Sequence, residues 1–289
     1  MRAFLTTILA SIRMRRFVIP MLCGALLLLV TASMFGVAVG RRTPLRNAAT
    51  AKKVVRVMTY NIHVGVGMDK KLDLVRIAEV IKRERPDFVG LQEVDRGVAR
   101  TKGVDQIAEL ARLTNMEYAF AYNLSYQGGQ YGVAVLSRHT ILSLDHRRYA
   151  NTRERERRGF LRIEANVNGR RLAFVTTHLD YQHEDGREFE TKQLLDALKP
   201  DNVPLIVVGD FNAEPNDSAY RLMLTRFTDA WTLRTADAPD AGNTYPAGTP
   251  AKRIDYVFYA KESGFRVRNI RVIETEASDH RPMVAEVEF

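Results

Sequence analysis

An apolar run that stops at two polar residues constrains this chain more than any other feature. Val207, Val208 and Gly209 precede Asp210 and Asn212, which stand two positions apart. Successive side chains of a strand point to opposite faces, so residues i and i+2 share one face. We therefore expect a strand end that directs a carboxylate and a carboxamide into one small volume, which is a geometry typical of catalysis.

Polar residues also mark the ends or starts of five other apolar segments. These segments are Tyr60-Asn61-Ile62-His63, Leu91-Gln92-Glu93, Thr177-His178-Leu179, Arg253-Ile254-Asp255-Tyr256 and Ser278-Asp279-His280. Hard cations prefer oxygen ligands, and phosphoester hydrolysis uses such cations together with groups that move protons. Carboxylates, amides and imidazoles gathered at strand ends are what this chemistry requires.

Charge is distributed unevenly along the 289 residues. Ten of the 43 Lys and Arg residues lie in residues 1–56, which contain no Asp or Glu, so 33 basic residues face 34 acidic ones in the remainder. Proteins that bind duplex nucleic acid through its phosphates usually have a basic domain. The nearly neutral remainder therefore argues against a general nuclease, whereas the basic N-terminal part suits an anionic membrane surface.

The N-terminal part predicts a membrane or export segment. Residues 1–16 form a basic leader, residues 17–40 contain no charged side chain, and residues 41–53 are polar, small and basic like a linker. About 20 apolar residues span a bilayer, so residues 17–40 are either a transmembrane signal anchor or a cleaved signal peptide. A short basic leader ahead of a long domain resembles an export signal, so we expect the domain outside the cytoplasm, although the basic residues 41–56 leave a cytoplasmic orientation open. Cys23 is the only cysteine, which excludes disulfides and cysteine-ligated zinc from residues 54–289.

Periodicity in residues 54–289 predicts an α/β domain. Strands are expected at 54–60, 87–91, 132–137, 160–167, 171–178, 204–210, 254–259, 266–274 and 282–288, and helices at 72–81, 104–114, 187–199 and 217–224. Asn168-Gly169 is a strong hairpin signal. With 46% apolar residues the chain can bury one substantial core. We expect two mixed sheets packed face to face with helices outside.

These segments, in this order, resemble the endonuclease/exonuclease/phosphatase superfamily of metal-dependent phosphoesterases. The resemblance covers residues 54–289 and rests on TYNIH, LQEVD, TTHLD, VVGDFNAEP, RIDYVF and SDHRP together. The segments NIHVGVGMD and THLDY resemble those of bacterial hydrolases related to the soluble domain of GPI-anchor lipid remodelling proteins, and those of sphingomyelinases. The resemblance implies a four-layer α/β/β/α sandwich of two mixed β-sheets, with the active site where strand ends from both sheets meet.

The resemblance also implies roles for eight residues. The expected ligands of Mg²⁺, or of Mn²⁺, are Asn61, Glu93 and Asp279, and the expected catalytic residues are His178, Asp210, Asn212, Asp255 and His280. Asp210 matches the residue that activates water for in-line attack on phosphorus, and Asn212 matches the one that orients the phosphate or the nucleophile. His280 matches the histidine that contacts the scissile phosphate, and Asp255 is its expected carboxylate partner. His178 is expected to donate to a phosphate oxygen or to the leaving group.

Three other segments keep alternative interpretations. The run from Arg153 to Arg158 mixes both signs of charge and is most simply a solvated loop, although Arg158 could reach a substrate phosphate. The loop 243–252 lies where the superfamily places substrate-recognition segments, and Tyr245 could pack on a lipid headgroup or a base. His63 departs from the acidic residue that repair-type nucleases carry at the comparable place, which puts metal ligation there in doubt.

These observations lead to a Mg²⁺-dependent hydrolase of phosphoester bonds, expected to be a monomeric phosphodiesterase that acts at a membrane surface. The expected substrate is a phosphoester, for which a lipid headgroup is one candidate. The first alternative is a secreted or membrane-tethered nuclease, which the charge balance disfavours. The second is a membrane-tethered binding module without catalysis, and the intact set of polar strand ends argues against it.

Overall fold

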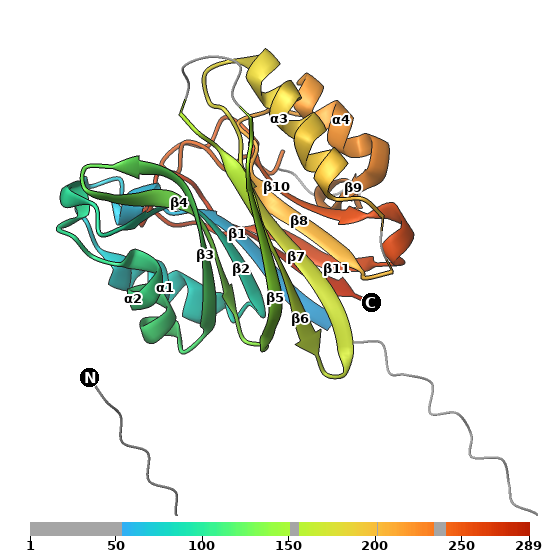
Figure 1. Ribbon diagram of the computed structural model, residues 1–289, viewed down its shortest axis with the longest axis horizontal. Helices are drawn as coiled ribbons and strands as arrows, with labels where there is room; N and C mark the ends of the chain where they lie inside the picture. The colour runs from blue at the N-terminus through green and yellow to red at the C-terminus, as the bar shows by residue number, and fades with distance from the viewer. Residues whose placement is uncertain (1–53, 151–155, 201, 234–240) are drawn as a thin grey trace, which may run out of the picture. The chain divides into compact units, whose positions relative to one another are not determined.

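Two six-stranded mixed sheets form the centre of the computed structural model, which describes residues 54–150, 156–200, 202–233 and 241–289 (Figure 1). The first sheet contains, in spatial order, β11 (Arg266–Val272), β12 (Met283–Glu288), β1 (Val54–Asn61), β2 (Phe88–Arg96), β4 (Gly129–Ser137) and β3 (Glu117–Tyr126). The second contains β5 (Ile141–Arg148), β6 (Gly159–Val167), β7 (Arg170–His178), β8 (Leu205–Asp210), β10 (Asp255–Ala260) and β9 (Phe227–Asp229).

Helices cover the outer face of each sheet. The first sheet packs against α1 (Leu74–Glu84) and α2 (Gln106–Thr114), and the second packs against α3 (Glu184–Ala197) and α4 (Ser218–Arg226), so the helices lie on opposite sides of the sheet pair in Figure 1. A third apolar cluster fills the space between the sheets. Burial of each large aliphatic or aromatic side chain in these clusters stabilises the folded state by about 1.5–3 kcal/mol relative to leaving it exposed. The predicted four-layer α/β/β/α sandwich is confirmed.

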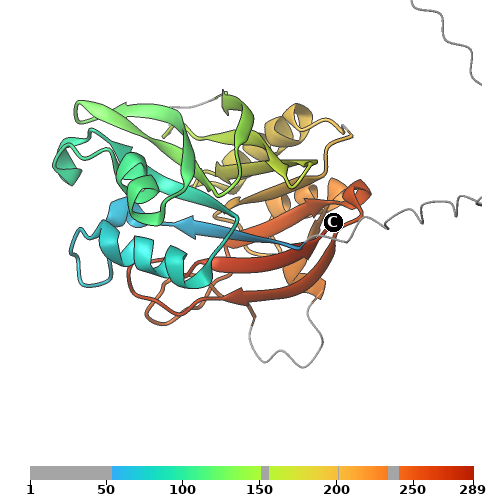
Figure 2. The same ribbon diagram turned by 90° about the horizontal axis from the view of Figure 1, so that it is seen from below.

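Strand directions bring the polar strand ends to one edge of the sandwich. In the first sheet, β1 and β2 run parallel, with Asn61 opposite Gln92 at their shared end. In the second sheet, β7 and β8 run parallel with His178 opposite Asp210, and β10 begins antiparallel to them with Asp255 beside Asp210. The sequence therefore places these groups together because every strand concerned ends or begins at the same edge (Figure 2).

A glycine lets the two sheets approach closely near this edge. Gly90 in β2 faces the second sheet, and a Cβ added there would lie 2.4 Å from Cγ2 of Val208. Two positions further on, Gln92 Nε2 donates a hydrogen bond of 2.8 Å across the sheets to Thr176 Oγ1. These contacts fix the separation between the strand that carries Glu93 and the strand that carries Asp210.

The boundaries of the helices follow from aspartates that precede them. Asp73, Asp105 and Asp217 each accept hydrogen bonds from backbone N–H groups in the first turn of α1, α2 and α4. The helix α1 starts two residues later than periodicity predicted, because Asp73 caps it. It ends at Glu84, since Arg85 adopts a left-handed conformation ahead of Pro86.

Three strands were not predicted from the sequence. β3 and β5 lie at sheet edges and expose residues on both faces, so their polar and apolar residues do not alternate cleanly. β9 has only three residues, which is too short for a period to show. The predicted hairpin at Asn168-Gly169 is present between β6 and β7.

The N-terminal predictions fall outside the described residues. The leader at 1–16, the apolar segment at 17–40 and the linker at 41–53 all precede Val54, where the description begins. Among the residues from Val54 onward that the structure describes, no helix is both long enough and apolar enough to cross a bilayer.

Candidate active site

The polar strand ends surround a cleft of about 820 Å³ at the edge shared by the two sheets. Six of the eight predicted site residues line it, namely Glu93, His178, Asp210, Asn212, Asp279 and His280. The other two, Asn61 and Asp255, are buried directly behind this lining and contact it through hydrogen bonds. The structure therefore brings all eight residues together.

Asp210 occupies the centre of the group at the end of β8. Its Oδ2 atom accepts a hydrogen bond of 2.9 Å from Asn61 Nδ2 and lies 3.4 Å from His178 Nε2 and 3.7 Å from His280 Nε2. Its Oδ1 atom accepts from the backbone N–H of Asn212. Burial disfavours the charged carboxylate and, with Asp255 nearby, raises the pKa of Asp210 to about 7, although His280 opposes the shift.

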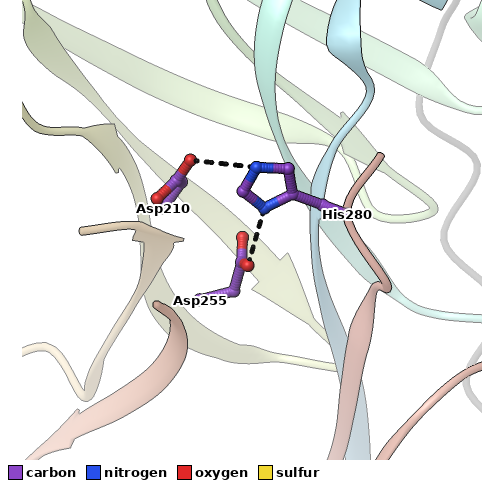
Figure 3. A group of neighbouring side chains, drawn as sticks. All are labelled: Asp210, Asp255 and His280. Carbon is purple, nitrogen blue, oxygen red and sulfur yellow. Dashed lines mark hydrogen bonds and ion pairs between the residues drawn. The ribbon is translucent and has the colours of Figure 1, made fainter. Parts of the chain in front are cut away.

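His280 is held by a carboxylate on its other side. Its Nδ1 donates to Asp255 Oδ2 at 2.9 Å, and both side chains are almost completely buried (Figure 3). Burial alone would lower the pKa of His280, but the Asp255 and Asp210 carboxylates outweigh it and raise that pKa to about 10. The ring is therefore an imidazolium at neutral pH, and it carries the proton on Nε2 towards Asp210.

Asp210, Asp255 and His280 also form a group that could hold a metal ion. One ligand atom from each residue lies within 4.8 Å of the others. A ligating histidine must be neutral, however, because the metal occupies the lone pair of a ring nitrogen. The close Asp255 carboxylate favours the protonated ring, and a proton on Nε2 competes with a cation for that nitrogen.

His178 has a cation where His280 has a carboxylate. Arg158 Nη1 lies 2.6 Å from His178 Nδ1, and the two side chains are 3% and 2% exposed. Burial and the Arg158 charge lower the pKa of His178 well below its usual range. An arginine only donates hydrogen bonds, so Nδ1 is the acceptor and the ring proton lies on Nε2. His178 is thus a neutral donor whose N–H faces Asp210, while Asn212 Nδ2, 3.1 Å from the same ring nitrogen, donates to the carbonyl of Leu179.

Glu93 offers the oxygen donors that a hard divalent cation prefers. It stands in a β-bulge of β2 with a positive φ of 57°, a strained conformation that turns its side chain into the cleft. Its Oε1 accepts from Asn61 Nδ2 at 3.1 Å, and Asn61 Oδ1 accepts from the His63 backbone N–H. Asn61 therefore ties Glu93 to Asp210. Asn61 turns its amide nitrogen towards both carboxylates and its oxygen towards His63, so the Glu93 carboxylate itself supplies the oxygen donors that suit Mg²⁺ or Mn²⁺.

Asp279 lines the same cleft and contacts His63, which is not part of the lining. Asp279 Oδ1 lies 3.7 Å from His63 Nδ1 and accepts from Ser278 Oγ at 3.4 Å. The same His63 nitrogen lies 3.1 Å from the backbone carbonyl of Val66. His63 thus contacts its own loop and a neighbouring carboxylate.

Within the run 153–158, expected to be a solvated loop, Arg158 is buried, whereas Glu156 and Arg157 are exposed as expected. Residues 153–155 lie outside the described residues, but Arg158 is buried, with Nη1 3.3 Å from Glu156 Oε1 and 3.4 Å from the Tyr131 hydroxyl. A buried guanidinium is stable there because it is paired and hydrogen-bonded. Its position just before β6, which pairs with the strand of His178, was the available signal.

The sequence indicated Tyr245 as a residue of the cleft but gave no sign of Arg100. Tyr245, in the loop expected to recognise substrate, lines the cleft with its ring centroid 4.9 Å from that of His280. Arg100, seven residues after Glu93, also lines the cleft and was not predicted. No period or motif marked it.

Comparison with known proteins identifies relatives of the whole sandwich. The model of the endonuclease/exonuclease/phosphatase family matches residues 58–280. The Escherichia coli K12 protein YbhP, which carries no assigned function, is 27% identical over 246 residues, covering 80% of this chain and 95% of YbhP. A Caenorhabditis elegans protein whose name provisionally assigns it to the neutral sphingomyelinases is 27% identical over 65% of this chain and 48% of its own length.

Among solved structures, an endonuclease/exonuclease/phosphatase protein from Beutenbergia cavernae superimposes with a TM-score of 0.69. The two sequences are 27% identical, and the match covers 82% of this chain and 72% of that protein. The same sandwich is therefore shared at the level of the fold.

Proposed function

Because the chain belongs to the endonuclease/exonuclease/phosphatase family of phosphoester hydrolases, we propose that it is a phosphodiesterase that works with a divalent cation, Mg²⁺ or Mn²⁺. The position of Asp210 carries this proposal. Its carboxylate lies in the cleft between the Nε2 atoms of two imidazoles that differ in charge, at 3.4 Å and 3.7 Å. In this arrangement Asp210 can accept a proton, and the His178 and His280 rings can each donate one N–H.

Asp210 is the proton acceptor. A general base works best when its pKa lies near the working pH, and burial brings the pKa of Asp210 to about 7. The carboxylate takes a proton from a water molecule that attacks phosphorus in line with the leaving oxygen. Asn212, two residues along the same strand end, orients that water or a phosphate oxygen.

The two histidines donate on either side of this base. His280, kept protonated by Asp255, places a positive charge where the pentavalent phosphorane develops negative charge. His178, neutral and fixed by Arg158, presents its Nε2–H to a phosphate oxygen or to the departing alkoxide. Neither ring needs to rotate to serve its role.

Glu93 and Asp279 would hold the divalent cation, with Asn61 positioning the Glu93 carboxylate. The bound cation would neutralise phosphate charge and so favour attack by water. The oxygen donors present in the cleft support this assignment.

We propose a lipid headgroup phosphodiester as the substrate, met at a membrane surface outside the cytoplasm. The nearly neutral charge of residues 57–289, the basic residues that precede them and the relative named as a neutral sphingomyelinase support this choice. Anchoring by residues 17–40 would hold the enzyme at that surface, and signal cleavage would release it as an exported monomer.

The test compares wild-type protein with the Asp210→Asn variant. Turnover of bis(p-nitrophenyl) phosphate and of p-nitrophenyl phosphate is measured with Mg²⁺, with Mn²⁺ and with a chelator. We expect chelator-sensitive hydrolysis of the diester, and a fall in kcat of about 10²–10⁴-fold in the variant, since that is the usual contribution of a general base. Asp145→Asn is the matched control, because Asp145 is an exposed partner of Arg147 on β5.

A second assay decides between the lipid and the nuclease alternatives. Headgroup release from sphingomyelin and phosphatidylcholine vesicles is compared with nicking of a supercoiled plasmid under the same conditions. Faster nicking would replace the lipid proposal with a nuclease. Absence of cation-dependent turnover of every phosphoester tested would leave only a binding module.

A further inference from the structure

Arg100 lies in the catalytic cleft but in no part of the proposed mechanism, and we propose that it forms a second anion subsite. The subsite takes a phosphate or carboxylate group carried by the same molecule as the scissile phosphate. It therefore specifies a substrate class, phosphoesters with a second anionic group, and it rests on the proposed phosphodiesterase function.

A buried carboxylate fixes the Arg100 side chain. Asp95 is completely buried at the end of β2, and its two carboxylate oxygens accept from Nε and Nη2 of Arg100, each at 2.8 Å. This two-point pairing fixes the plane of the guanidinium as well as its position. Nη1 makes no hydrogen bond within the described parts of the chain. About a third of the side chain, 35%, remains exposed.

The backbone around Arg100 is held equally firmly. Arg100 belongs to the single turn η2 (Ala99–Thr101), and its N–H donates to Gln127 Oε1 at 3.0 Å, while the N–H of Ala99 donates to the Gln127 carbonyl. Gln127 lies at the tip of the β3–β4 hairpin, and Gly129 of that hairpin packs against the backbone of Gly97. Anion binding by Arg100 therefore requires little further ordering of the loop.

Two tyrosines place the guanidinium beside the catalytic groups. Its carbon atom lies 4.6 Å from the ring centroid of Tyr126 and 5.3 Å from that of Tyr131. The Tyr131 hydroxyl in turn lies 3.4 Å from Arg158 Nη1, and Arg158 contacts His178. Arg100 is thus separated from the catalytic histidine by one aromatic ring and one guanidinium, a span that a single substrate molecule can bridge.

A second arginine of the cleft shows what a purely structural pairing looks like. Arg187 also pairs with an aspartate, donating from Nε and Nη2 to Asp217, but its Nη1 donates as well, to the carbonyl of Asp180. Its side chain is only 13% exposed. All the nitrogens of the Arg187 side chain are used within the protein, whereas Nη1 of Arg100 has no acceptor among the described residues. The difference indicates that Arg100 receives an external acceptor.

Two matched pairs of diesters test the subsite. The first pair is glycerophosphoinositol and glycerophosphoinositol 4-phosphate, and the second is the dinucleotide TpT with and without a 5′-phosphate. Within each pair the molecules differ by one phosphate. We expect the wild-type enzyme to show about tenfold higher kcat/KM for the phosphorylated member of at least one pair, mainly through KM. The pair that shows the preference distinguishes a headgroup source of the second anion from a nucleotide source.

Substitution of Arg100 should remove that preference. In Arg100→Ala the ratio of kcat/KM within the pair should fall to about one, and Arg100→Lys should keep part of it, because lysine retains the charge without the two-point clamp. Arg96→Ala is the control, since Arg96 pairs with Asp105 in the same loop region and does not line the cleft. It should keep the wild-type ratio.

Binding measurements test the same preference for the phosphorylated diester without requiring turnover. Calorimetric titration of the four diesters into Asp210→Asn and Asp210→Asn/Arg100→Ala, in Mg²⁺, measures the preference even when the enzyme hydrolyses none of them. Loss of hydrolysis with a binding preference that depends on Arg100 would refute the proposed function and keep the subsite. Equal binding within both pairs, or a preference that survives Arg100→Ala, would refute the subsite.

Discussion

His280 and His178 flank the same carboxylate, yet their surroundings make the first ring cationic and leave the second neutral. Asp255 lies behind His280 at 2.9 Å and raises its pKa to about 10, whereas Arg158 lies behind His178 at 2.6 Å and helps to lower its pKa well below the usual range. Both rings are almost completely buried, so exposure does not separate them. The partner on the far nitrogen decides what each histidine can do.

The difference extends to the strands that carry the two partners. Asp255 opens β10 beside Asp210 in the same sheet, so its pairing with His280 joins that sheet to the segment before β12. Arg158 precedes β6, and its contacts with His178 and Tyr131 join the second sheet to β4 of the first. The two histidines thus receive their protonation states from different parts of the sandwich.

The largest expected effect comes from removing the charged member of the comparison. His280→Gln should lower kcat by about 10³-fold, because it removes a positive charge from the position where the transition state gains negative charge. His178→Gln should lower kcat by about 10²-fold, since glutamine still offers an N–H donor. Steady-state kinetics with bis(p-nitrophenyl) phosphate measure both. Equal losses in the two variants would contradict the assigned difference in charge.

Removing the carboxylate behind His280 should have the next largest effect. Asp255→Asn should lower kcat by about 10²-fold at neutral pH, because the ring loses the partner that keeps it protonated. The alkaline limb of the pH profile should move below its wild-type position near 10. Circular dichroism checks that the variant is folded. An unchanged alkaline limb would show that Asp255 does not set the charge of His280.

Removing the cation behind His178 should act more weakly. Arg158→Gln should raise the pKa of His178 and lower kcat by about tenfold, because the ring loses the donor that fixes its tautomer. Nitrogen NMR of selectively labelled histidine reports the tautomer directly and does not depend on activity. A wild-type spectrum with the proton on Nδ1 of His178 would overturn the assignment.

The smallest expected effect concerns the pH profile of His178→Gln, whose limbs should stay at their wild-type positions. The pKa of Asp210 is about 7 without a cation, so with Mg²⁺ bound the wild-type rate should rise with pH below about 7 as Asp210 becomes ionised, and it should fall through about 10, where His280 loses its proton. The Mg²⁺ concentration is kept fixed, because a nearby cation favours the ionised carboxylate and lowers the acid limb. His178→Gln should reduce the rate at every pH and move neither limb. A displaced limb would mean that His178 titrates during catalysis.

The sequence predicts the strand ends of this site better than the partners behind them. Asn61, His178 and Asp210 end buried strands, and a buried strand shows its boundaries as an abrupt change from apolar to polar residues. Glu93 follows such a stretch too, although its inward direction depends on a bulge that no residue pattern indicates. The conjunction of these ends was sufficient to predict the fold and the cleft.

The groups that tune the site were harder to predict, because their environment is assembled from distant segments. Arg158 stands in a run of charges, which is ordinarily solvated, and only the packing of Tyr131 from β4 and of His178 from β7 buries it. Arg100 and Asp95 lie five residues apart around a turn, a spacing that has no periodic signature. Pairings of this kind need coordinates.

The direction of β1 has a practical consequence for any attachment to this enzyme. Val54, where β1 begins, pairs with Glu288 near the C-terminus, whereas Asn61 at the other end of the strand lies behind the cleft, about 23 Å away for seven steps of an extended chain (Figure 2). A bead or fusion partner joined directly before Val54 would therefore be attached at the end of β1 that lies away from the cleft. Protein immobilised in this way should keep its cleft open to dissolved esters.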